Sequence, residues 1–407
     1  MLGATVLSNL EQLIAELCPD GVEYVKIKDV YTRLKGTPIT AGKMKEIENP
    51  SGDIRIFAGG KTVISAFEKD IPNANITRVP SVLVQSRGVI DAVYYEGAFT
   101  FKNEMWAYTA DDKTSVRYLF YVLKSNMHIF RDAASGMGSL PQISLKVTED
   151  FIVPLPPLPV QREIVRILDN FTELTAELTA ELTAELTARK KQYEYYRLQI
   201  VNKANDNNFV PIRSLGNWTG GSTPSMAETT YWENGTIPWV SSKDMKLTTM
   251  IDTQDHISQK ALAETSIKLL PKNTVAIVAR SGILKHTLPV VYIPFETTVN
   301  QDIKALVTVE TVLPKYAYFV INAFGRDILK KTKKQGGTVD SLDVNAFMNY
   351  QVPVPPLEEQ QRIVTILDRF DALCNDLTNG LPAEIEARKK QYEYYRDKLL
   401  TFKEKKA

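Results

Sequence analysis

The sequence predicts an α+β (mixed α/β) fold in which two globular domains are joined by two long antiparallel coiled-coil helices. Three observations support this prediction. One segment of the chain occurs twice, and apolar residues recur within each copy at helical spacing. The stretches 20–157 and 208–356, which precede the two copies, each mix short β-type runs with helical patterns and differ from one another far more.

The repeat has a constant offset of 199 positions. Residues 153–171 return as 352–370, and the decapeptide at 188–197 returns unchanged at 387–396. Over 153–200, 28 of 48 residues are identical to those 199 positions later, which establishes an internal, pseudo-twofold duplication. We divide the chain into an N-terminal helix (1–19), a first variable domain (20–157), a central helix with linker (158–207), a second variable domain (208–356) and a C-terminal helix (357–407).

The repeated segments predict long amphipathic helices. Apolar residues at spacings of three and four run from Ile164 to Ile200, so about 40 helical residues form a rod of ~60 Å. Only 201–207 separates this helix from the second domain, so the second helix must run back along the first. We expect antiparallel pairing rather than two separate surface helices, with the C-terminus near the N-terminal helix. Gly380 and Pro382 should interrupt the second helix.

Three TAEL tetrapeptides occupy Thr175–Leu186 in the central helix. We expect Leu and Ala to provide packing and helix propensity, and Glu and Thr to face outward or flank the seam. An exact repeat is also prone to replication slippage, so the run could be its relic. Slippage by one unit would nevertheless change the length of the helix.

Both variable domains contain short strand and helix patterns. We expect strands at Val79–Val84, Val93–Tyr95, Val275–Ala279 and Val290–Ile293, and helices at 116–130 and 315–331. The segment 220–245 is rich in turn residues and aromatics, with Trp218 just before it and Trp232 and Trp239 within it. These aromatics form either a recognition surface or a packed loop core, and we favour the packed core for Trp232 and Trp239.

Charge is nearly balanced, with 49 Lys and Arg against 48 Asp and Glu, which argues against a chain whose whole surface binds nucleic acid. The sharpest basic cluster, Lys330–Lys334, runs into Gln335–Thr338, which includes two glycines. Lysines followed by exposed glycine amides suit phosphate oxygens, but they equally suit a solvated helix end. The candidate DNA-binding residues are Lys330, Lys331, Lys333, Lys334, Lys61 and Arg87.

Catalytic and metal-binding patterns are missing from the sequence. Gly60-Lys61-Thr62 resembles the end of a phosphate-binding P-loop, but Arg55 stands where that motif needs its first glycine. The three histidines lie on separate segments, and two cysteines cannot form a disulfide framework. We therefore expect no catalytic, cofactor or metal site. With no membrane-length apolar run and no Lys or Arg before Lys26, we also expect a cytoplasmic protein without a membrane segment.

The duplicated VPLPPL…Q…I…ILD.F segment and the GGSTP…YW…IPWV run at 220–240 resemble the specificity subunits of type I restriction–modification systems. The TAEL run resembles the IC subgroup. The first domain keeps Gly-Thr-Pro at 36–38 but has no YW…IPWV.

This resemblance implies a subunit without catalysis of its own. Each variable domain would read one half of a split, asymmetric site in double-stranded DNA. The helices would set the spacer and bind two modification subunits, which carry S-adenosylmethionine and methylate adenine. Restriction subunits would add translocation and cleavage driven by ATP and Mg²⁺. The alternatives are a stand-alone sequence-specific DNA-binding regulator, or a helical scaffold with no role in DNA binding.

Overall fold

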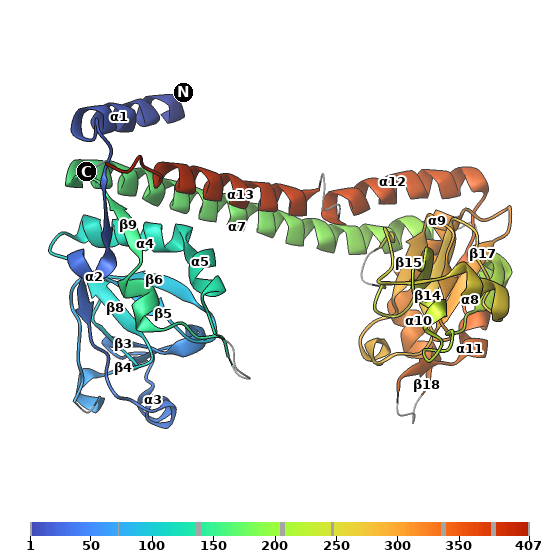
Figure 1. Cartoon of the computed structure of the whole chain (residues 1–407). Coiled ribbons are helices and arrows are strands. Elements are labelled where there is room, and N and C mark those ends of the chain that lie inside the picture. The colour runs from blue at the N-terminus through green and yellow to red at the C-terminus, as the bar shows by residue number, and fades with distance from the viewer. Residues whose placement is uncertain are drawn as a thin grey trace. The chain divides into compact units, whose positions relative to one another are not determined.

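The computed structural model describes residues 2–71, 73–135, 140–203, 208–245, 248–334, 339–375 and 380–405. Contacts divide the chain into two units, which we describe separately (Figure 1). The first unit comprises Met1–Thr179 with Ala387–Ala407, and the second comprises Ala180–Glu386. Helix α7 (Leu158–Lys203) begins in the first unit and ends in the second.

The first unit contains a globular domain with two small sheets. A four-stranded sheet has the order β2-β8-β5-β6, and a three-stranded sheet has the order β4-β3-β7, in which β3 and β7 are parallel. Strands β1 and β9 form a separate antiparallel pair. The strands are β1 (Glu23–Lys26), β2 (Thr32–Leu34), β3 (Ile54–Phe57), β4 (Val63–Ala66), β5 (Ser81–Gln85), β6 (Asp91–Tyr95), β7 (Phe99–Phe101), β8 (Trp106–Thr109) and β9 (Ile152–Leu155).

Helices cover the first four-stranded sheet on one side. Helix α4 lies against β5 and β6, and its Tyr118, Leu119 and Val122 are buried in the main core. The helices before α7 are α1 (Leu2–Leu17), α2 (Ile27–Val30), α3 (Ala41–Ile47), α4 (Lys113–Ser125), α5 (Met127–Asp132) and α6 (Leu145–Glu149). The three-stranded sheet has its own core, which includes Ile54 and Ile56.

The second unit repeats this architecture. Its sheets have the orders β11-β17-β14-β15 and β13-β12-β16, with β12 and β16 parallel, and β10 pairs with β20. The strands are β10 (Phe209–Pro211), β11 (Gly216–Gly220), β12 (Ile237–Val240), β13 (Asp255–Ile257), β14 (Thr274–Val278), β15 (Val290–Ile293), β16 (Thr298–Val299), β17 (Ile303–Thr308), β18 (Lys333–Lys334), β19 (Ser341–Leu342) and β20 (Gln351–Pro353). The helices are α8 (Gln259–Glu264), α9 (Pro314–Ala323), α10 (Gly325–Thr332), α11 (Val344–Asn349), α12 (Leu357–Asn375) and α13 (Leu381–Leu399).

The two variable domains therefore share one strand order, strand for strand, although their sequences differ. Each places one helix, α4 or α9, across the two strands at one edge of the larger sheet, β5 and β6 or β14 and β15. Sheet topology survives sequence divergence because many apolar combinations can fill the same core volume. The duplication seen in the repeated helices thus extends to the domains between them, and the predicted mixed α/β fold is confirmed.

The chain ends meet within the first unit, as predicted. Val22 accepts a hydrogen bond from the Lys405 amide and donates one to the Lys403 carbonyl, both 2.9 Å long. Tyr24 OH donates to the Phe402 carbonyl at 2.9 Å. The C-terminal segment therefore adds an extended strand-like edge next to the residues that come after α1.

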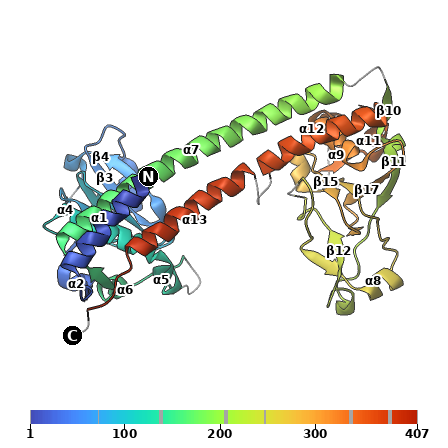
Figure 2. The ribbon, with the colours of Figure 1, turned by 90° about the horizontal axis from the view of Figure 1, so that it is seen from above.

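In each unit α7 pairs with a C-terminal helix that runs in the opposite direction (Figures 1 and 2). In the first unit Phe171 packs edge-on against Tyr395 with ring centroids 6.2 Å apart, and Thr172 hydrogen-bonds Tyr392 at 2.9 Å. In the second unit Tyr193 lies 6.3 Å from Phe370 of α12. The predicted antiparallel pairing is confirmed within each unit.

The TAEL run is helical throughout. Leu178, Leu182 and Leu186 are partly buried, whereas the glutamates of the run are exposed, as expected. The alanines are exposed as well, so the leucines provide the packing and the alanines contribute helix propensity. In each tetrapeptide the alanine lies two positions before the leucine. Successive positions on a helix are rotated by about 100°, so the two side chains point to nearly opposite sides of the helix.

The C-terminal helix is divided as predicted. Helix α12 ends at Asn375 and α13 begins at Leu381. Pro382 is the second residue of α13, where proline costs little because the first helical amides have no partner within the helix. None of the described helices combines the length and the apolarity that crossing a membrane requires.

Candidate nucleic-acid interface

An exposed arginine comes just after the buried strand β5 in the first domain. Arg87 lies between two backbone hydrogen bonds, from Ile143 N to Ser86 O at 2.9 Å and from Gly88 N to Pro141 O at 2.8 Å. This bridge fixes the backbone on both sides of the arginine. The guanidinium is therefore presented from a rigid position.

The second domain presents Arg280 in the same way after β14. The bonds run from Leu342 N to Ala279 O at 2.8 Å and from Ser281 N to Asp340 O at 2.9 Å. The Arg280 side chain is exposed. The two arginines are thus equivalent in the two domains, each bridged to the segment that leads to the next helix.

An antiparallel pair of residues stands beside each arginine. Ser135 pairs with Gln142 in the first domain, and Lys334 pairs with Ser341 in the second, 199 positions later. Figure 1 shows β18 at the end of its domain remote from α12. The residues 335–338, whose glycine amides suit either phosphate oxygens or a solvated helix end, lie outside the described residues.

Two of the predicted candidates meet at one cavity. Lys61 and Arg87 both line a hollow of about 700 Å³ between the β3–β4 turn and the loop after β5. Figure 1 shows β3, β4 and α3 at the end of the first domain remote from α7. The charged lining residues are Lys45, Glu48, Lys61, Arg87, Lys102 and Glu104. Because Glu104 is paired with Lys102 at 3.0 Å, the cavity keeps a basic excess.

Lys61 belongs to a tight hairpin turn. Gly60 and Lys61 both have left-handed backbones, with φ of 71° and 78°, and Ala58 N donates to Thr62 O at 2.9 Å. Two consecutive left-handed residues are typical of the turns that join antiparallel strands. A P-loop would lead into a helix, so the rejection of that motif agrees with the structure.

The cluster Lys330–Lys334 is divided between ion pairs and free lysines. Lys331 lies 2.7 Å from Asp327 and 5.4 Å from the Tyr350 ring, and its hydrogen bond lowers the pKa of Asp327. Lys333 lies 3.1 Å from Asp340. These two lysines therefore hold α10 and β18 in place.

The side chains of Lys330 and Lys334 are exposed, and neither side chain makes a hydrogen bond or ion pair within the described residues. Helix α10 ends at Thr332, so Lys330 also complements the negative end of the helix dipole. Both interpretations of the cluster, phosphate binding and a solvated helix end, are therefore compatible with the structure. The side chains of Lys330 and Lys334 are available to bind a phosphate, whereas those of Lys331 and Lys333 are ion-paired.

Sequence comparison at a fixed offset missed Arg280. Arg87 and Arg280 are 193 positions apart rather than 199, because the loops on either side differ in length. A signal was present: each arginine is the second residue after the strongly apolar strand β5 or β14. Arg280 is ion-paired with Asp302 at 3.0 Å, an acid that limits its positive potential.

The tryptophans of the second domain form a packed core, as favoured. Trp232 and Trp239 pack edge to face at 5.1 Å, and Trp239 is 7% exposed. Their indole N–H groups donate to the Ser225 and Ser222 carbonyls. These rings therefore fix the 220–245 segment rather than offer free stacking faces.

Within the described ranges, His, Cys, Asp and Glu form no group of three that could hold a metal ion. His256 is 3.0 Å from Asp252. The two domains share their strand topology, and each presents a bridged arginine after the buried strand β5 or β14, so the chain is a structural duplication.

The chain belongs to the family of type I restriction modification DNA specificity domains, which matches residues 19–188 and 205–387. It is 46% identical over 298 residues to the EcoR124I/EcoR124II specificity subunit of Escherichia coli, covering 72% of each chain. It is 34% identical over 321 residues to a putative type I specificity subunit of Haemophilus influenzae, covering 75% of this chain and 77% of the other. It is thus a type I restriction–modification specificity subunit, and the competing regulator and scaffold interpretations find no support among these relatives.

Solved structures share the fold. One, reported for complex assembly and conformational transition of a type I system, aligns with a TM-score of 0.67 over 94% of this chain and 98% of the other, at 15% identity. The S subunit of Mycoplasma genitalium aligns with a TM-score of 0.50 over 93% of this chain and 96% of that one, also at 15% identity.

Proposed function

We propose that each variable domain reads one half of a split, asymmetric DNA site. The observation that carries this proposal is the shared topology, which presents Arg87 and Arg280 from equivalent bridged loops. Arginine donates two parallel hydrogen bonds to guanine O6 and N7 in the major groove, the commonest specific contact to a base. Lysines such as Lys61, Lys330 and Lys334 supply phosphate contacts, which position the domain without reading sequence.

The asymmetry of the site is a consequence of the divergence of the domains. The first domain sets Arg87 over a basic hollow with Lys61, whereas the second pairs Arg280 with Asp302. Surroundings this different favour different bases. One scaffold can therefore present two unrelated half-sites.

The chain itself carries out no chemistry in this proposal. Modification subunits bound to the long helices supply S-adenosylmethionine and methylate adenine, and restriction subunits use ATP and Mg²⁺. The near-neutral net charge of +1 supports this division of labour, because DNA affinity at physiological salt depends on many cationic contacts, which partners can provide. Purified without its partners, the chain should neither methylate nor cleave DNA.

The experiment is methylation mapping of the chain co-expressed with its cognate modification subunit. Arg87→Ala should relax the base preference in one half-site, and Arg280→Ala should relax it in the other, each by about 1–3 kcal/mol per lost bidentate contact. A stand-alone regulator would instead bind its site tightly without any partner. Relaxation of both half-sites by either substitution would contradict the proposal.

A further inference from the structure

The two copies of the repeat place one glutamine in different surroundings. Gln360, in the second unit, is fully bonded. Its Nε2 donates to Pro355 O at 2.8 Å and to Thr311 O at 2.9 Å, and its Oε1 accepts from Leu313 N at 2.8 Å. It ties the start of α12 to the loop before α9.

The counterpart Gln161, in the first unit, is only half bonded. Its Nε2 donates to Pro156 O at 2.8 Å. Among the described residues its Oε1 has no hydrogen-bond donor, although the residue is only 4% exposed. A buried carbonyl oxygen without a donor is costly, so native structures nearly always supply one.

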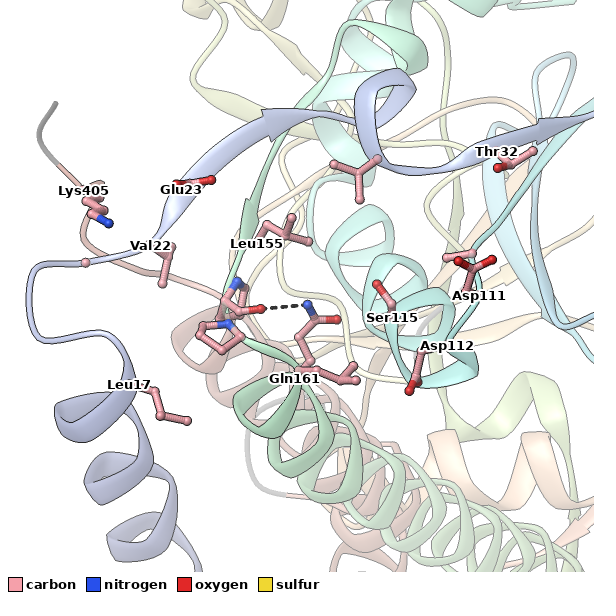
Figure 3. A pocket seen from close by; sticks show the side chains of 16 residues that line it. Leu17, Val22, Glu23, Thr32, Asp111, Asp112, Ser115, Leu155, Gln161 and Lys405 are labelled. Carbon is pink, nitrogen blue, oxygen red and sulfur yellow. Dashed lines mark hydrogen bonds between the residues drawn. The ribbon is translucent and has the colours of Figure 1, made fainter.

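Loop length explains the difference. Five residues, 309–313, join β17 to α9, and they reach Gln360. Only three, 110–112, join β8 to α4. The shorter loop leaves a cavity of about 590 Å³ against Gln161. Figure 3 shows the Gln161 carbonyl turned away from its own bonded amide and toward the side of Ser115.

The charged lining of this cavity consists of three carboxylates, from Glu23, Asp111 and Asp112, and one lysine, Lys405, and much of the rest is apolar. Asp112 is occupied, because it caps Thr114 N and pairs with Arg162 at 3.2 Å. Glu23 and Asp111 also line the cavity and have no ion pair within the described residues. The apolar lining comes from Leu17, Val22, Val30, Leu155, Pro156, Pro157 and Leu158.

Such a lining selects its occupant by chemistry. The excess of carboxylates repels DNA phosphates and attracts a cation. The apolar surface suits the methylene stem of a long basic side chain. The Gln161 oxygen can accept a hydrogen bond from any donor, and a lysine, an arginine or a peptide group provides an N–H.

We infer that this cavity is a docking site for a lysine- or arginine-bearing segment of the modification subunit, whose N–H group completes the hydrogen bonding of Gln161. The inference rests on the proposed function for the identity of the partner. In the second unit the loop 309–313 bonds Gln360 and leaves no place for such a contact. The inference therefore gives the first unit a partner contact that the second unit lacks.

The test is site-specific photocrosslinking in the purified complex of the full chain with its modification subunit. A benzoylphenylalanine replaces Val30, which lines the cavity and is 37% exposed. The matched control replaces Val309, which is 41% exposed and lies in the closed loop. We expect the Val30 probe alone to capture a modification-subunit peptide that contains Lys or Arg, as read by mass spectrometry.

Charge reversal provides a second readout. Asp111→Lys should weaken assembly with the modification subunit by about tenfold, while Glu310→Lys, its counterpart 199 positions later, should leave assembly unchanged. Asp111→Asn should shift the affinity in the same direction by less, and unchanged thermal unfolding shows that each variant folds.

A complex that assembles and methylates normally while the Val30 probe captures nothing, or captures a second copy of this chain, would overturn the docking site and leave the proposed function intact. A water-filled cavity gives the same result, with Asp111→Lys assembling as well as the parent chain. Failure of the parent chain to form any methylating complex would overturn both the proposed function and the docking site that rests on it.

Discussion

At the scale of the residue, neighbours decide which basic side chains are available to DNA. Lys331 and Lys333 belong to one sequence cluster with Lys330 and Lys334, yet only the first two are ion-paired. An ion pair places a carboxylate where a phosphate would bind. Residue type alone therefore overstates the size of the basic surface.

We predict that Lys330→Ala with Lys334→Ala weakens DNA binding equally for all sequences. The salt dependence, as the slope of log affinity against log salt, should flatten by about 0.9 for each lost phosphate contact. Lys331→Ala is the matched control and should change the slope little, because Asp327 already neutralises it. Fluorescence anisotropy of the assembled complex across a salt series measures both. A changed preferred sequence with an unchanged slope would mean that the cluster reads bases.

A second prediction concerns the paired glutamines. Gln360→Ala removes three hydrogen bonds and takes this partner from the part-buried Leu313 amide and Thr311 carbonyl, which should cost about 2–4 kcal/mol. Gln161→Ala removes one bond and should cost about 1 kcal/mol. Calorimetric unfolding of the full-length variants measures the difference. Equal losses of unfolding free energy in the two variants would show that Gln161 contributes as much stability as Gln360 despite its fewer hydrogen bonds.

Sequence reasoning located part of the candidate site and missed part. Lys61 and Arg87, chosen from the sequence, line one cavity, but nothing in the letters places them together. Arg280 was missed because the β14–β15 loop is longer than the β5–β6 loop, which shifts the alignment. The sequence also gives no sign that the Gln161 Oε1 is without a donor among the described residues, because this depends on the length of a loop about fifty residues earlier.

At the scale of the element, periodicity predicts the helices well. The expected stretches 116–130 and 315–331 appear as α4 with α5 and as α9 with α10. Each is broken once, at Asn126 and at Phe324. Gly380 and Pro382 also mark the start of α13 correctly. The strand order was not predictable, since pairing between distant strands leaves little trace in one sequence.

The TAEL run yields a prediction about spacing. Deleting Thr179–Leu182 shortens an α-helix by ~6 Å and rotates the remainder of the helix by a net ~40°, while one base pair advances ~3.4 Å and turns ~34–36°. The longer helical step can project to about one base-pair step if the rod lies oblique to the DNA axis. We expect the unread spacer between half-sites to shorten by one base pair, with both half-sites unchanged.

The measurement is methylation of a DNA library with fixed half-sites and variable spacers. The division between α12 and α13 gives the partner helix a place to absorb the slip. An unchanged preferred spacer, in a deleted protein that still folds and methylates, would show that the helix does not measure distance.

At the scale of the whole molecule, duplication explains the division of roles. The repeated segments keep 28 of 48 positions identical, and the helices that they form pair antiparallel within each unit. The domains keep only a strand order, so their exposed loops are free to diverge. Because the helices are constant and the domains vary, sequence specificity can change while the assembly with partner subunits stays the same.

The most direct test of this account exchanges residues 20–157 for the corresponding domain of another specificity subunit and maps methylation by the assembled complex. The unchanged parts are the repeated helices and 208–356. The account predicts that one half-site changes completely while the other half-site and the spacer length stay as they were. A change in both half-sites, with the exchanged chain folded and assembled, would contradict the claim that each domain reads its half of the DNA site independently.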